Sequence, residues 1–83
     1  NLIEDIDKNL FDSLFNLINL DLSHNSIKFI DDYSFQNNLY LDYLYLNDNK
    51  MLKSISNRTL FGLISIKDVH ISENILDISQ NII

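Results

Sequence analysis

The sequence predicts an α/β solenoid, a single repeat segment in which short parallel strands from successive units form one sheet. The stretch LINLDLSHNSI at 17–27 recurs as LDYLYLNDNKML from residue 41 and as IKDVHISENIL from residue 66. Offsets of 24 and 25 residues indicate stacked repeats that share one core, since no unit can bury its apolar side chains alone. The 83 residues include one Gly and no Pro, so other residues have to form the turns between strands.

The repeat divides the chain into four units. The shared frame is LxxLxLxxN, and it is filled by Leu17, Leu20, Leu22 and Asn25, by Leu41, Leu44, Leu46 and Asn49, and by Ile66, Val69, Ile71 and Asn74. Asn1 lies 24 residues before Asn25, so a partial first unit spans 1–16. The second unit is 17–40, the third is 41–65, and the fourth, 66–83, is truncated or degenerate after Leu76.

Each unit is expected to contribute one strand, because apolar and polar residues alternate within it as on a strand with one buried face. The predicted strands are 19–23, 43–47 and 68–72. A second apolar pair in each unit, Ile27 with Ile30 and then Leu52 with Ile55, should fill the interior together with Phe35 or Leu60.

The pattern resembles the leucine-rich repeat family, in its 24-residue class LxxLxLxxNxLxxLxxxxFxxLxx. The third unit carries one extra residue after Asn49, and Asn38 stands where an apolar residue is usual, with Leu39 beside it as the expected substitute. The resemblance implies a curved right-handed coil with the strands on its concave face. Loops and short helical turns would then cover its convex face.

The resemblance also assigns a role to the Asn that ends each frame. Its side chain would turn the chain out of the strand and bond to the backbone of adjoining loops. The residues concerned are Asn1, Asn25, Asn49 and Asn74. We expect Asn25, Asn49 and Asn74 to be buried, because unpaired backbone groups in the interior cost about 1 to 3 kcal/mol each.

Partners of this family usually bind the concave face, through the residues that alternate with the buried Leu. These are Asn19, Asp21, Ser23 and His24, then Tyr43, Tyr45, Asn47 and Asp48, then Asp68, His70, Ser72 and Glu73. Parallel strands lie about 4.8 Å apart, so equivalent positions should form rows across the sheet. Exposed Tyr flanked by carboxylates favours protein recognition, because Tyr offers a large apolar area at little entropic cost. The alternative is a solvated polar face that touches no partner.

Composition argues against several other functions. Twelve acidic and six basic residues give a net charge of −6, which does not suit a phosphate backbone, so we expect no nucleic-acid partner. No apolar run is long enough to span a bilayer, and we expect no direct membrane insertion by this segment. Two His and scattered carboxylates match no standard metal spacing, and nothing places a nucleophile beside an oriented base in a closed pocket. We expect no catalytic residues, metal or cofactor.

A glycosylation sequon at Asn57, Arg58 and Thr59 agrees with the ectodomains of Toll-like receptors, slit and chaoptin, which this repeat class resembles. We therefore expect part of an extracellular receptor or adhesion protein that binds a protein partner on its concave face. The alternatives are an intracellular scaffold in the cytoplasm and a spacer without ligand contacts. The sequence starts at a frame Asn and ends without a polar cap, so it reads as a fragment whose bare ends favour self-association.

Overall fold

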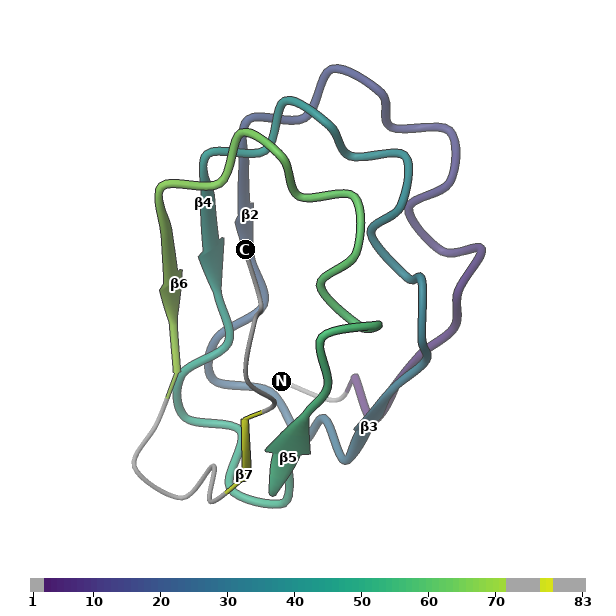
Figure 1. Cartoon of the computed structure of the whole chain (residues 1–83). Helices are drawn as coiled ribbons and strands as arrows, with labels where there is room; N and C mark the ends of the chain where they lie inside the picture. The colour runs from purple at the N-terminus through teal and green to yellow at the C-terminus, as the bar shows by residue number, and fades with distance from the viewer. Residues whose placement is uncertain (1–2, 72–76, 79–83) are drawn as a thin grey trace.

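A three-stranded parallel sheet organises the computed structural model, which describes residues 3–71 and 77–78 (Figure 1). Its strands run in the order β2 (Asn19–Asp21), β4 (Tyr43–Tyr45) and β6 (Asp68–His70). The parallel arrangement is confirmed, although each observed strand covers only the first three of the five predicted residues. Leu22 still donates to the Tyr45 carbonyl at 2.8 Å, but the Asp21 carboxylate accepts from the Ser23 amide at 3.0 Å and starts a turn there.

Four further strands of two residues each form two smaller parallel pairs, which the sequence did not predict. β1 (Asp5–Ile6) pairs with β3 (Phe29–Ile30), and β5 (Ser54–Ile55) pairs with β7 (Asp77–Ile78). β3 and β5 follow the turns at Asn25 and Asn49. In the described part of the chain, β3 and β5 belong to different pairs and are not bonded to each other.

The segments that lead back to the next strand contain no helix within 3–71. The expected short helical turns are replaced by successive turns in which an amide bonds to the carbonyl three residues earlier, as from Leu10 to Asp7 and from Asp12 to Asn9. Polar side chains compete for the same backbone groups: the Asn9 amide donates to the Asp7 carboxylate, and the Ser34 hydroxyl donates to the Asp31 carbonyl. Such local bonds offer the backbone an alternative to a helix.

Burial is deepest in the third unit, whose strand β4 lies between β2 and β6 in the sheet. Leu41, Leu44 and Leu46 are fully buried, whereas the equivalent Leu20 and Val69 are only partly covered. Most of the predicted interior is confirmed: Ile27, Leu52, Ile55, Phe35 and Leu60 are buried, whereas Ile30 is only partly buried. Each unit therefore completes its core with side chains from the units beside it.

At position 38 the polar residue itself enters the core, and the expected substitution by Leu39 is wrong. Leu39 is 41% exposed, while Asn38 is fully buried. The Asn38 amide donates to the carbonyls of Phe11 and Leu14 at 3.2 and 3.0 Å, so it links the second unit to the first. Its Oδ1 has no hydrogen-bond partner among the described residues, which is unusual for a buried acceptor.

Gly62 lies where the third unit packs closely against the backbone of the second. Its φ of 99° lies in the left-handed region, and a Cβ at this position would come within 2.6 Å of the Gln36 Cα. Backbone cannot yield to that contact as a flexible side chain can. The chain's single Gly therefore serves a close approach between units.

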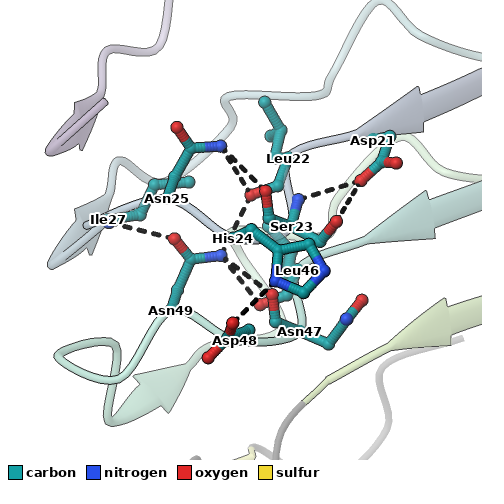
Figure 2. A network of polar contacts seen from close by, with 10 residues as sticks. All are labelled: Asp21, Leu22, Ser23, His24, Asn25, Ile27, Leu46, Asn47, Asp48 and Asn49. Carbon is teal, nitrogen blue, oxygen red and sulfur yellow. Dashed lines mark hydrogen bonds and ion pairs between the residues drawn. The ribbon is translucent and has the colours of Figure 1, made fainter. Parts of the chain in front are cut away.

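Asn25 and Asn49, which end their frames and are called the ladder Asn, tie strand ends together, as Figure 2 shows. Asn49 is fully buried; its Nδ2 donates to the Leu46 carbonyl at 2.9 Å and to the Leu22 carbonyl of the preceding unit at 3.0 Å. Its Oδ1 accepts from the Ile27 amide, also in the preceding unit, at 3.0 Å. One side chain thereby satisfies backbone groups of two units.

Asn25 repeats this arrangement with less burial than expected. Its Nδ2 donates to the carbonyls of Leu22 and Ser23, and its Oδ1 accepts from the Ile3 amide at 3.4 Å. Asn25 is only partly buried, and it shares the Leu22 carbonyl with Asn49. Asn1 and Asn74 lie outside the described residues.

Replacing Asn49 by Ala should destabilise the protein more than replacing Asn25 by Ala. In Asn49→Ala the Ile27 amide becomes a buried donor without a partner, and such a group costs about 1 to 3 kcal/mol. Asn25→Ala exposes its released groups to water and should cost less. Urea unfolding of both variants measures the difference. Asn47→Ala is the control, because Asn47 is only half-buried. Equal losses for the two ladder variants would contradict this account.

Candidate functional site

The outer face of the three-stranded sheet brings the predicted recognition residues into rows. The strand register aligns Asn19 with Tyr43 and Asp68 in one row, and Asp21 with Tyr45 and His70 in the next. These are the rows that the repeat spacing predicted. Ser72 and Glu73 lie outside the described residues. We call this surface the sheet face, and it comprises Asn19, Asp21, Ser23, His24, Tyr43, Tyr45, Asn47, Asp48, Asp68 and His70.

Two aromatic rings stack in the middle of the sheet face. The Tyr45 and His70 rings lie 4.6 Å apart between centroids, with 22° between their planes. Because they come from adjacent strands in one row, the stack fixes the direction of both side chains. Tyr43, one row away, is exposed and remains accessible to a partner. The strand pairing thus presents aromatic area in a defined orientation.

His24 and Asp48 occupy the same position in successive units and make the shortest polar contact between units on this face. His24 Nδ1 lies 2.6 Å from Asp48 Oδ2 (Figure 2). Both residues have left-handed backbone, with φ of 58° and 60°, directly before their ladder Asn. These turns would ordinarily favour Gly, and here His and Asp take that conformation. The His24 hydrogen bond lowers the pKa of the Asp48 carboxyl below its ordinary value of 3.8.

The sheet face carries negative charge at neutral pH. The Ser23 hydroxyl and amide both donate to the Asp21 carboxylate, and these bonds lower the pKa of Asp21. Asp68 contributes a third carboxylate, 3.1 Å from the His70 Nε2. Each of the two His therefore stands beside a carboxylate, and the aromatic surface is surrounded by acceptors of hydrogen bonds.

The described residues show no constellation for metal binding or catalysis. Within 3–71 and 77–78, no group of three or more His, Asp or Glu side chains is arranged to hold a metal ion. Ser23 and His24 are near carboxylates, but on an open sheet rather than in a closed pocket. In the same part of the chain, no helix has the length and apolar character needed to cross a bilayer.

Comparison with known families assigns the fold. A family model described as leucine rich repeat matches residues 1–51 and again residues 15–81. The chain belongs to the leucine-rich repeat family. Searches of curated proteins and of solved structures found no match. Leucine-rich repeat domains generally mediate protein–protein interaction and are typically not enzymes.

The sequon lies away from the sheet face, in the turn segment of the third unit. Asn57 is exposed, whereas Thr59 is buried, with its amide donating to the Ser56 hydroxyl at 3.1 Å. The acceptor side chain is accessible to solvent in the folded chain.

Sequence reasoning missed a second surface of this leucine-rich repeat, between β3 and β5. A cavity of about 300 Å³ opens there beside Phe29 and Met51, neither of which belongs to the repeat frame. The signal that could have revealed it was the extra residue after Asn49, which changes the path of the chain before β5. The repeat frame tolerates such an extra residue, so the frame alone does not indicate its structural effect.

Removing the His24 ring should raise the pKa of Asp48 back toward 3.8, because the hydrogen bond from His24 is the largest cause of the lowering. His24→Gly suits this test, since Gly tolerates the left-handed backbone. Because the pKa of Asp48 is lower in the folded chain than in the unfolded chain, its ionised carboxylate stabilises the fold at pH values above the unfolded pKa. This contribution is lost as the pH falls through the folded-state pKa, below about 4. Side-chain carboxyl NMR titration measures the shift.

The control for that titration is Asp21, whose lowered pKa depends mainly on Ser23 and should change far less in His24→Gly. An Asp48 midpoint that stays where it is in the parent protein would show that the His24 contact is not formed in solution.

Proposed function

We propose that this chain recognises a protein partner through the sheet face. The observation that supports the proposal most directly is the row containing Tyr45 and His70, stacked beside the exposed Tyr43. Oriented aromatic side chains contribute strongly to protein interfaces because they bury a large area without losing many rotamers. The leucine-rich repeat supplies the rigid sheet that holds them.

The partner surface should be basic and partly apolar. Asp21, Asp48 and Asp68 surround the aromatic rings, and the whole chain carries a net charge of −6. Lys or Arg side chains of a partner could bond to these carboxylates while an apolar side chain packs on Tyr43. Because such charges are exposed, they contribute mainly to the association rate, and the complex should weaken as salt is added.

We place this module in an extracellular receptor or adhesion ectodomain of which the 83 residues form one repeat segment. Support comes from the 24-residue repeat class and from the exposure of Asn57 in its sequon. In this proposal the coil curves so that the sheet face is concave, and Asn57 carries a glycan on the outer side. An intracellular scaffold and a structural spacer are the alternatives, and the two experiments below discriminate among them.

Tyr43→Ser should weaken binding of the tagged chain to intact source cells by about tenfold or more, because an exposed Tyr at the centre of an interface contributes at that level. Binding is measured by flow cytometry over a range of chain concentrations. The matched control is Tyr40→Ser, since Tyr40 is also exposed but lies before β4 and is not one of the sheet-face residues.

Unfolding curves of both variants should match that of the parent chain, because neither side chain belongs to the core. Equal binding by parent and Tyr43→Ser would favour the spacer, and equal losses in Tyr43→Ser and Tyr40→Ser would remove the argument for the sheet face.

The extracellular placement predicts that a membrane-impermeant amine reagent labels the protein on intact source cells. Peptides spanning Lys28, Lys50 or Lys67 would report the labelling by mass spectrometry, and the mass of the Asn57 peptide before and after glycan removal would report glycosylation. Labelling only after lysis would instead favour the cytoplasmic scaffold. An abundant cytosolic protein from the same cells serves as the control for membrane integrity.

A further inference from the structure

A groove opens between β3 and β5, and none of the residues that line it belongs to the sheet face. Its cavity of about 300 Å³ is lined by both strands and by the turn that precedes β5. The residues that matter for its chemistry are Lys28, Phe29, Asp32, Met51, Lys53 and Ser56. We call this cavity the β3–β5 groove.

The groove has a structural cause in the third unit. Ile27 follows Asn25 by two residues, whereas Leu52 follows Asn49 by three, so the chain takes a longer path before β5. The second and third units are held together on either side of that path. The Ile27 amide donates to Asn49 Oδ1 at 3.0 Å, and the Tyr33 amide donates to the Arg58 carbonyl at 2.9 Å. Between these two links, β3 and β5 are not paired.

Apolar side chains line part of the groove but remain open to solvent. Phe29 is 68% exposed and Met51 is 57% exposed, although both are large and apolar. They come from different units and border the same cavity. Met is unbranched and polarizable and adapts to varied partners, so the pair suits an apolar side chain of a ligand.

Two lysines line the same groove, in a chain whose net charge is −6. Lys28 and Lys53 each directly precede a strand of the groove, β3 and β5, and both line it. They are two of only six basic residues against twelve acidic ones. Lys28 Nζ lies 3.7 Å from Glu4 Oε1 in an exposed pair, and such pairs contribute little, so a ligand carboxylate can compete for this lysine.

The groove lining also includes one carboxylate. The Ser56 hydroxyl donates to the Asp32 carboxylate at 3.2 Å, and both residues line the cavity. This carboxylate reduces the positive charge of the groove, but the two lysines still outnumber it. The charge at the groove therefore favours a ligand whose acidic groups lie toward the two lysines and whose apolar group enters between Phe29 and Met51.

We propose that the β3–β5 groove binds an acidic peptide segment of a partner protein, with one apolar side chain packed against Phe29 and Met51 and carboxylates beside Lys28 and Lys53. This site is separate from the sheet face and has the opposite charge preference. It does not depend on the function proposed above, and the two sites can be tested independently.

The chain offers a direct reporter, because Met51 is its only methionine. Labelling the methionine methyl group of the 83-residue chain gives one NMR signal that reads the groove alone. The probe is a synthetic peptide with one leucine flanked by two aspartates on each side. We expect its addition to shift the Met51 signal with saturation, and the same titration with salt added should give weaker binding.

Two variants test the chemistry. Lys28→Glu combined with Lys53→Glu should weaken peptide binding about fivefold or more, because two attractions become repulsions. Lys67→Glu, an exposed lysine before β6 that pairs with Asp42, is the matched control for charge reversal and should leave the affinity unchanged. Phe29→Ser should also weaken binding, and its high exposure means that folding is unaffected.

A Met51 signal that does not move at millimolar peptide would overturn the proposal. So would equal affinity for a peptide in which the four aspartates are replaced by lysines, because charge would then play no part. If alanine in place of the peptide's leucine changed nothing, the apolar part of the site would be refuted. Tyr43→Ser should bind the probe as the parent does, which keeps a failure of the sheet-face proposal distinct from a failure here.

Discussion

The rest of the structure depends on the need to satisfy backbone groups where each strand ends. The Leu22 carbonyl accepts from both Asn25 and Asn49, so the end of one strand is bonded within its own unit and to the next. An amide is the right group for this position because it offers donors and an acceptor on one short side chain. Ala would leave buried groups unpaired, and Asp would place a carboxylate against carbonyls.

This constraint explains how the two faces of the fold acquire different properties. Because the ladder Asn fixes the strand ends, the residues before it are held in register, and Tyr45 meets His70 across the sheet. After the ladder Asn the strands are shorter. Two-residue strands pair there only locally, and the turns that follow are held by bonds such as that from the Ser34 hydroxyl to the Asp31 carbonyl.

The sheet could be predicted from the sequence because its signal is periodic. Leu20, Leu44 and Val69 recur at fixed spacing, and burial of one face leaves a single register in which all three point inward. Position 38 misled the prediction because hydrophobicity alone favoured Leu39. Asn38 occupies the core instead, since its amide reaches the carbonyls of Phe11 and Leu14 in the preceding unit. The β3–β5 groove was missed for a related reason: Phe29 and Met51 are not periodic, and only the folded path brings them together.

The third unit is one residue longer than the second, yet Tyr43 still pairs with Asp68 as Asn19 pairs with Tyr43. The additional residue is absorbed between Asn49 and Leu52, after the ladder bonds have been made. Insertions and substitutions therefore act on different parts of this repeat. Substitutions on the strands alter the side chains that the sheet presents without changing its register, whereas an insertion after the ladder Asn changes the β3–β5 groove. A lineage of such proteins could diversify one surface by drift in length and leave the other intact.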